Sequence, residues 1–189
     1  LNIIGGIDDA DEGYISIDGE KTADMNEKRL TQYRRKHLGY VFQMYNLIPN
    51  LTAVENVELP LIYRGVSRSV RQELSREALK KVGLEHRMDH KPSEMSGGQQ
   101  QRVAIARAIA QAPPVILADE PTGNLDSNST KEIMDILKGL HNEGRTVILI
   151  THDNDIAAQA KRVIKIKDGK VESDSGQTVP VEELQTAGA

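Results

Sequence analysis

Polar side chains follow two continuous apolar runs of this sequence. Asp119 and Glu120 come directly after the run VILA, and the triplet THD, with His152 at its centre, comes directly after the run TVILI. Continuous apolar runs are typical of strands buried on both faces of a parallel sheet, and the carboxyl ends of such strands share one edge. At that edge, one carboxylate can hold Mg²⁺ and the other can orient and deprotonate a water. Taken alone, the acid pair fits a solvated turn equally well, and His152 fits a structural histidine.

The stretch SGGQQQR, residues 96–102, combines a capping residue with two glycines ahead of a helix-forming run. Ser96 is a favourable N-cap. Gly97 and Gly98, followed by Gln99, let backbone N–H groups come close to an anion at the positive end of the helix. The loop therefore suits a phosphate. A plain helix cap after the breaker Pro92 is the alternative interpretation.

Two further polar residues are candidates for the same chemistry. Gln43 ends the stretch LGYVFQ, a predicted strand, so its amide can bind Mg²⁺ or contact the attacking water at a carboxyl edge. Asp126 lies in the turn PTGNLDS after the acid pair. The default interpretation of Asp126 is a helix N-cap, because the residues from Lys131 onward are predicted to be helical.

The sequence around these residues predicts the helices and strands that must position them. A strand, a helix and a strand in succession predict a βαβ unit, and hence an α/β fold with a parallel sheet. A hairpin is expected around Asp168-Gly169. Predicted strands cover 14–19, 38–43, 115–118 and 146–150, and predicted helices cover 27–36, 67–82 and the segments that start at 53 and 131.

Three local signals refine the predicted helices. Thr52 and Glu55 form a capping box at the start of the helix from 53. The helix over 67–82 carries a thin apolar stripe, which suggests a small helical subdomain; the stripe comprises Val70, Leu74, Ala78 and Val82. The helix from 131 has a wider apolar face and ends at Gly144; that face comprises Ile133, Ile136, Leu137 and Leu140.

Composition excludes several classes of protein. The chain has 189 residues, 38% of them hydrophobic and 28% charged, a net charge of −4 and no cysteine. These values are typical of a globular domain with a real core. The negative charge argues against a general nucleic-acid binder, and the lack of cysteine excludes disulfides and thiolate sites. The sequence has no apolar run of the length that spans a bilayer.

Five segments together resemble the ATPase domains of ABC transporters. They are Gln43, MSGGQQQR (95–102), ILADEP (116–121), NLD (124–126) and THD (151–153), in the order and spacing of that family. The stretch YVFQMYNLIPNLTAVENVELPL is most similar to the lipoprotein-releasing, macrolide-exporting and peptide-resistance subgroup. The resemblance implies a P-loop NTPase (RecA-like) fold over 1–171, with a core of 1–43 and 113–171 and a helical subdomain of about 44–112. Residues 172–189 are expected to form a flexible tail.

The resemblance also implies a role for each candidate. Asp119 would be the Walker B aspartate, a ligand of Mg²⁺ together with Gln43. Glu120 would be the catalytic base, and His152 the switch histidine on the γ-phosphate. The ATP-binding set would comprise Gln43, Ser96, Gly97, Gly98, Gln99, Asp126 and His152.

The family's phosphate-binding loop, G-x-x-x-x-G-K-[ST], does not occur in this sequence. The nearest candidate, Gly19-Glu20-Lys21-Thr22, has Glu20 at the second glycine position and Ile15 at the first, and it lies in a hairpin-like turn. In relatives the loop stands directly ahead of a segment resembling LNIIGGID (1–8). We therefore expect an N-terminally truncated chain that binds ATP weakly by itself.

Partners follow from the same resemblance. Two such domains pair head to tail, as a homodimer or pseudo-dimer, with ATP between the P-loop of one and the signature loop of the other. Integral membrane subunits would dock near Gln43 and the 45–60 segment, at the cytoplasmic face of the membrane. Tyr45, Leu47, Ile48 and Leu51 are candidates for that contact, with core packing as the alternative. The rival functions are a soluble ABC-type ATPase of DNA repair or translation, and an inactive fragment.

Overall fold

The computed structural model describes residues 1–17, 19–22 and 25–176 of the chain. The chain divides into two compact units, Leu1–Ile150 and Thr151–Ala189. The first contains the sheet and the main helices, and the second contains a short helix and a hairpin.

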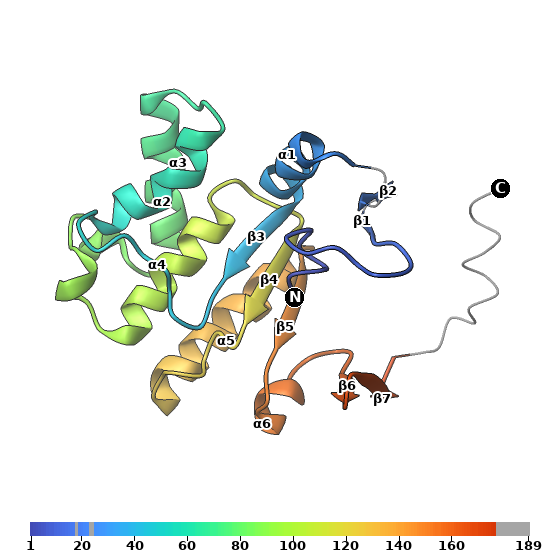
Figure 1. The fold of residues 1–189 in the computed structure, drawn as a ribbon. Coiled ribbons are helices and arrows are strands. Elements are labelled where there is room, and N and C mark those ends of the chain that lie inside the picture. The colour runs from blue at the N-terminus through green and yellow to red at the C-terminus, as the bar shows by residue number, and fades with distance from the viewer. Residues whose placement is uncertain (18, 23–24, 177–189) are drawn as a thin grey trace. The chain divides into compact units, whose positions relative to one another are not determined.

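A parallel sheet forms the centre of the first unit (Figure 1). It consists of β3 (Leu38–Val41), β4 (Val115–Asp119) and β5 (Thr146–Ile150), in the order β3-β4-β5. Helix α5 (Ser127–Asn142) connects β4 to β5 and packs against β5. The βαβ unit expected from the sequence is therefore present, and the register pairs Asp119 with Ile150 at the carboxyl edge.

The two apolar runs differ in burial. Residues 115–118 of β4 are buried, as expected for a strand with neighbours on both sides. The expectation that TVILI is buried on both faces is wrong: β5 is only half-buried, and Ile150 is 40% exposed. The reason is its position, because within the described residues β5 pairs with β4 alone and lies at the sheet edge.

The N-terminal part covers one face of this sheet. A short hairpin, β1 (Ser16–Ile17) and β2 (Glu20–Lys21), precedes α1 (Glu27–His37), which Asn26 caps. Leu30 and Tyr33 of α1 pack into an apolar cluster with the alternate residues of the strands that point the same way. The cluster comprises Met25, Leu30, Tyr33, Leu38, Val115 and Leu117.

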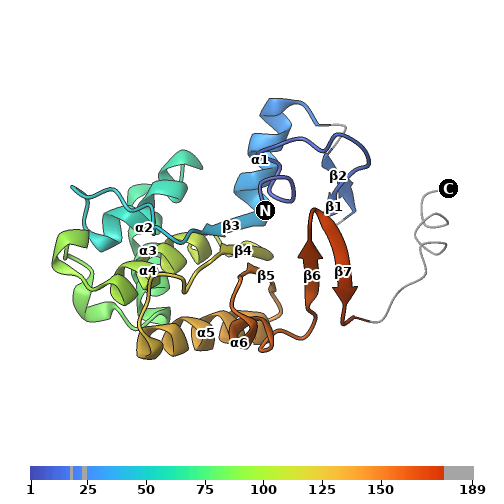
Figure 2. The same ribbon diagram turned by 60° about the horizontal axis from the view of Figure 1, so that its bottom comes forward.

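Helices α2 (Ala53–Tyr63), α3 (Arg68–Lys81) and α4 (Gly97–Ile109) pack against one another beside the sheet (Figures 1 and 2). Helix α4 also packs on β3 and α5, so it joins this helical group to the sheet. The predicted capping box at Thr52 and Glu55 is present. Two 3-10 turns, η2 (Glu85–Arg87) and η3 (Pro92–Glu94), connect α3 to α4.

The buried faces of α3 and α5 differ from the predicted ones. Of the predicted stripe, Ala78 and Val82 are buried as expected, whereas Val70 and Leu74 are 45% and 39% exposed. Ser75 and Leu79 are buried instead, so the packed face of α3 coincides only in part with the predicted stripe. On α5, Met134 is buried and Ile136 only half-buried, while the other predicted residues lie in the core. Gly144 follows α5 with φ 94°, the left-handed conformation expected for a C-terminal glycine.

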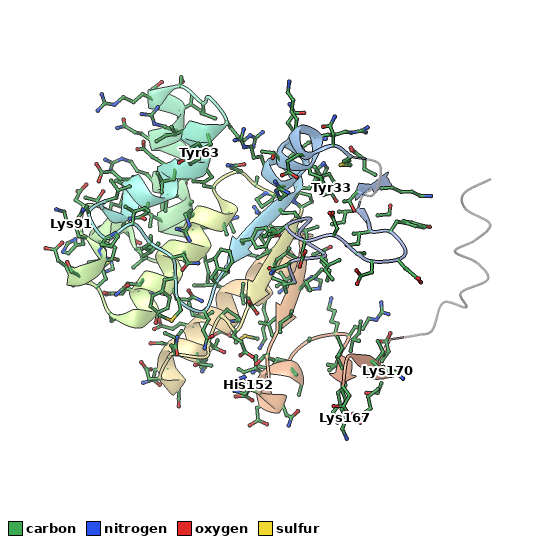
Figure 3. All side chains as sticks on the ribbon, in the orientation of Figure 1. Tyr33, Tyr63, Lys91, His152, Lys167 and Lys170 are labelled. Carbon is green, nitrogen blue, oxygen red and sulfur yellow. The ribbon has the colours of Figure 1, made fainter. Side chains whose placement is uncertain are left out.

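The second unit consists of α6 (Asn154–Ala157), β6 (Ile164–Lys167) and β7 (Lys170–Asp174). β6 and β7 form the predicted hairpin, and Lys167 and Lys170 flank its turn (Figure 3). Asp168 and Gly169 adopt φ 50° and 75°, as a two-residue primed turn requires. The predicted tail started too early, because β7 continues to Asp174; its part from 177 to 189 lies outside the described residues.

Candidate functional site

The acid pair occupies the carboxyl end of the central strand. Asp119 is the last residue of β4, and the backbone N–H of Glu120 donates to the carbonyl of Ile150 at 3.0 Å. The chain then turns, since the N–H of Gly123 donates to the carbonyl of Glu120 at 3.1 Å. Glu120 has φ 44°. A non-glycine residue in this region costs about 1–3 kcal/mol and is concentrated at functional sites.

Gln43 lies against the turn that follows the acids. β3 ends at Val41, so the prediction that Gln43 ends the strand is wrong; it lies two residues further on, where pairing with β4 has stopped. A Cβ atom at position 123 would lie 2.7 Å from Nε2 of Gln43, so only glycine permits this approach. The Gln43 carbonyl accepts from Nδ2 of Asn124 at 3.5 Å. Gln43 thus lies close to the turn that follows the acid pair.

The loop SGGQ forms the start of α4. Ser96 is the N-cap: its Oγ accepts from the N–H of Gln99 at 3.3 Å, and Oε1 of Gln99 accepts from the N–H of Ser96 at 3.0 Å. Gly97 and Gly98 are the first two helical residues, whose N–H groups have no partner within a helix. The predicted cap is confirmed, and the anion site at the two glycine N–H groups stays a prediction.

Both glycines of this loop are closely packed. A Cβ on Gly98 would lie 2.6 Å from Oγ of Ser129 on α5, and a Cβ on Gly97 would lie 2.8 Å from the hydroxyl of Tyr45. The loop is therefore wedged between the start of α5 and the segment after Gln43. A side chain at either glycine would push these segments apart.

Asp126 is the N-cap of α5, as the default interpretation expected. Its Oδ1 accepts from the N–H groups of Asn128 and Ser129 at 3.0 and 2.9 Å, and its Oδ2 accepts from the hydroxyl of Ser129 at 2.9 Å. These bonds, those from Ser129 first, lower the pKa of Asp126. Asp126 thereby orients the same Ser129 that packs on Gly98.

The segment 44–52 is an ordered loop. Arg107 of α4 donates to the carbonyls of Tyr45 and Asn46, both of which have a positive φ. Burial lowers the pKa of Arg107 and raises that of Tyr45. Asn56 on α2 is fully buried and donates to the carbonyls of Ile48, Leu51 and Thr52.

Of the four residues considered for partner contact, Ile48 is the most open. It is 47% exposed, whereas Tyr45, Leu47 and Leu51 are half-buried. Tyr45 also contacts the start of α4. Packing within the domain therefore accounts for much of the burial of Tyr45, whereas the exposed side chain of Ile48 is available for contact with a partner.

His152 lies in the second unit, just before α6 (Figure 3). Asp153 caps this helix by accepting from the N–H groups of Asp155 and Ile156 at 2.8 and 3.2 Å. The N–H of Asp153 donates to Oγ1 of Thr151 at 3.0 Å. The triplet THD is thus a structured turn into α6.

Sequence reasoning assigned no role to Gln101 and Arg107, which the structure places behind the site. Gln101 is fully buried, and its Nε2 donates to the carbonyls of Phe42 and Pro121. One signal was available. Gln101 stands four residues before Ile105, on the apolar side of the helix, where an amide needs a partner.

The chain has an α/β fold with a parallel sheet, an acid pair at the end of the central strand and a helix that starts with two glycines. Comparison with solved ABC ATPase cassettes places this fold in the P-loop NTPase class. The chain belongs to the ABC transporter family: the family model described as ABC transporter matches residues 1–123.

Curated relatives include the macrolide export ATP-binding/permease proteins MacB of Shewanella sp. (strain W3-18-1) and of Photorhabdus laumondii. They are 46% identical over 187 residues and 49% identical over 186 residues, which cover 99% and 98% of this chain. A probable syringafactin export ATP-binding/permease protein of Pseudomonas syringae is 46% identical over 94% of the chain. The chain spans 29% of the length of the two MacB proteins.

Solved structures agree with this family. A dimeric structure of a post-hydrolysis state of the ATP-binding cassette MJ0796, bound to ADP and Pi, superposes with a TM-score of 0.82 at 49% identity. A second dimeric structure of MJ0796, described as a bacterial ABC transporter cassette, gives 0.82 at 50%. Both alignments cover 92% of this chain and 77% of the other. The predicted family and fold class are confirmed.

Proposed function

We propose that this chain is the ATP-hydrolysing part of an ABC exporter of the macrolide-efflux or lipoprotein-release type. The observation that carries the proposal is the contact between Gln43 and the turn after Asp119 and Glu120. It brings a water-orienting amide and two carboxylates to one sheet edge. The exporters among the relatives support the type of transport.

Glu120 acts as the general base of hydrolysis. Its carboxylate takes a proton from the water that attacks the γ-phosphate, and the Gln43 amide orients that water. His152 donates a hydrogen bond to the γ-phosphate. The left-handed backbone at Glu120, with φ 44°, ends the extended conformation of the strand at this residue.

The donor set fits Mg²⁺. Asp119 and Gln43 supply a carboxylate and an amide oxygen, which are hard ligands, and the described residues contain no cluster of three His, Asp or Glu side chains. Mg²⁺ prefers such sparse protein ligation because it retains water and binds phosphate oxygens. When bound, the ion would neutralise charge on the phosphates.

The loop Ser96–Gln99 serves the nucleotide of a second copy. The N–H groups of Gly97 and Gly98 and the positive helix end attract the γ-phosphate across a head-to-tail dimer, with Asp126 at the same interface. The MJ0796 structures are dimeric, which supports the pairing of two cassettes. The partner domain would be a second copy or a homologous cassette, and no nucleic acid takes part.

Membrane attachment goes through separate membrane-embedded segments. Within the part of the chain that the structure describes, no helix has the length and apolar character needed to cross a bilayer. Ile48 and its neighbours in the 45–60 segment provide the docking surface, on the cytoplasmic side of the membrane. Binding of ATP closes the dimer, hydrolysis opens it, and the docked segments move with it.

Replacement of Glu120 by Gln tests the function. In the full-length protein, Glu120→Gln removes the base but keeps the size of the side chain, so ATP turnover is expected to fall by about a thousandfold while ATP binding persists. Phosphate release and nucleotide binding measure the two effects. The matched control is Glu73→Gln on the exposed side of α3, which should turn over normally. Normal turnover in Glu120→Gln would remove Glu120 from the role of base.

A further inference from the structure

Gln101 makes two hydrogen bonds that join the segments flanking the site. Its Nε2 donates to the carbonyl of Phe42 at 3.3 Å and to the carbonyl of Pro121 at 2.6 Å. Phe42 directly precedes Gln43, and Pro121 directly follows Glu120. A single amide on α4 therefore holds the chain next to both residues that handle the attacking water.

The orientation of this amide follows from its partners. Both partners are carbonyl oxygens, so only the NH₂ group of Gln101 can face them. The side chain is fully buried, and Oε1 has no hydrogen-bond partner among the described residues. A buried acceptor without a partner is unfavourable, whereas the two hydrogen bonds of the NH₂ group are favourable. An apolar side chain would remove both contributions, so their effects on stability oppose each other.

The Pro121 bond acts on the backbone of the base. Proline has a fixed φ, so holding its carbonyl fixes the remaining torsion of the turn that follows Glu120. That turn also contains the bond from the Gly123 N–H to the Glu120 carbonyl. Together these bonds hold Glu120 at φ 44°, a conformation that relaxes without support.

The hydrogen bond to the Phe42 carbonyl affects Gln43, the other residue that is proposed to contact the attacking water. The carbonyl of Phe42 belongs to the peptide group that joins Phe42 to Gln43. The hydrogen bond therefore fixes the direction of the chain at Gln43, beyond the end of β3. The amide of Gln43 then meets Gly123. Loss of the Gln101 amide would release both segments at once.

Gln101 stands one helical turn after Gly97 and Gly98 on the same helix. We propose that Gln101 is a positioning residue, which fixes Glu120 and Gln43 relative to the loop that contacts the partner's nucleotide. Displacement of the start of α4 by a bound phosphate is then passed to the chain's own base. This inference rests on the proposed ATPase function.

The test compares Gln101→Leu with wild type in the full-length protein. Without the two bonds, kcat is expected to fall by about tenfold or more, because small displacements of reacting groups are costly. The KM for Mg-ATP should stay within about twofold, and circular dichroism checks that the variant is folded. The matched control is Gln111→Leu, since Gln111 makes one exposed hydrogen bond, with Arg64, beyond the end of α4.

Gln101→Glu supplies a second measurement, which decides the matter if Gln101→Leu does not fold. Burial raises the pKa of a carboxyl group, and only the protonated form can donate to the Pro121 carbonyl. The ratio of its kcat to that of wild type should therefore rise as the pH falls from about 8.5 to about 6.5. A merely structural glutamine predicts a flat ratio.

The outcomes separate the two proposals. A wild-type protein without ATPase activity refutes the proposed function. If the wild type is active, either of two results overturns only the positioning role. One is a folded Gln101→Leu variant whose kcat lies within about twofold of that of wild type. The other is a flat kcat ratio for Gln101→Glu. A kcat loss with unchanged KM in Gln101→Leu, and a rising ratio in Gln101→Glu, support it.

Discussion

Backbone conformations that most residues avoid are concentrated around the site. Five non-glycine residues have a positive φ among the described residues, and three of them, Tyr45, Asn46 and Glu120, flank the water-handling groups. Each is held by side chains of α4 or by the turn at Gly123. The strain is stored in the two segments that must keep a fixed geometry.

Gly123 is the residue whose replacement tests this geometry most directly. In Gly123→Ala, the new Cβ would come within 2.7 Å of the Gln43 amide and displace it. We expect kcat of the full-length protein to fall by about tenfold, because the amide no longer orients the water. Steady-state ATPase kinetics measure the change.

Gly139→Ala is the matched control. Position 139 lies in α5, where a Cβ atom meets no other atom within 4 Å. The substitution should raise stability by about 0.5–1 kcal/mol through helix propensity and leave kcat unchanged. Equal activities in both alanine variants would show that Gln43 tolerates displacement.

At the scale of the element, α3 gives a test of the packed face. Leu79 is fully buried, so Leu79→Ala should lower the free energy of unfolding by about 2–5 kcal/mol. Leu74 is 39% exposed, so Leu74→Ala should cost less than about 1 kcal/mol. Urea-induced unfolding followed by circular dichroism compares them, and the reverse order would restore the stripe predicted from the sequence.

The sequence predicted those elements whose signals are local. The capping box of α2, the hairpin turn at Asp168-Gly169 and the cap of α5 at Asp126 depend on neighbouring residues, and all three are present. The packed side of α3 was missed because Ser75 is buried and Val70 exposed, and only the positions of α2 and α4 decide this. The same holds for β5, whose burial depends on what pairs beside it.

For the candidate site too, only some of the residues could be predicted from the sequence. The places of the SGGQ loop and of Asp119 could be predicted, because the loop starts a helix and Asp119 ends a strand, whereas Gln43 lies two residues beyond the end of its strand. Gln101 and Arg107 could not, since their bonds reach backbone carbonyls 20 to 62 residues away. The place of Gln101 on the apolar side of the helix indicates that its amide needs a partner, but it does not indicate which carbonyl accepts from it.

At the scale of the whole molecule, the head-to-tail arrangement predicts complementation. Glu120→Gln disables a copy's own base, and Ser96→Arg disables the loop it offers to the partner. A mixed dimer of these two single variants keeps one site with both an intact base and an intact loop. Random 1:1 coexpression should therefore give roughly a quarter of wild-type ATPase activity, although each variant alone is inactive.

The control places both substitutions in one copy and pairs it with wild type. No site is then intact, and no activity is expected beyond that of wild-type homodimers. If each copy instead completed its own site, the mixture of the two single variants would be inactive and the control mixture would keep roughly half of wild-type activity, which would contradict sites shared between copies.

The half-exposed strand β5 has a practical consequence for such mixing experiments. Its outer row of backbone N–H and C=O groups, with Ile150 40% exposed, is a template on which strands of other molecules can add. The isolated chain should therefore self-associate as its concentration rises, with or without nucleotide. Val147→Lys would oppose this edge-to-edge growth. Association that this substitution removes is aggregation through β5, whereas association that persists is the pairing of two ATPase domains.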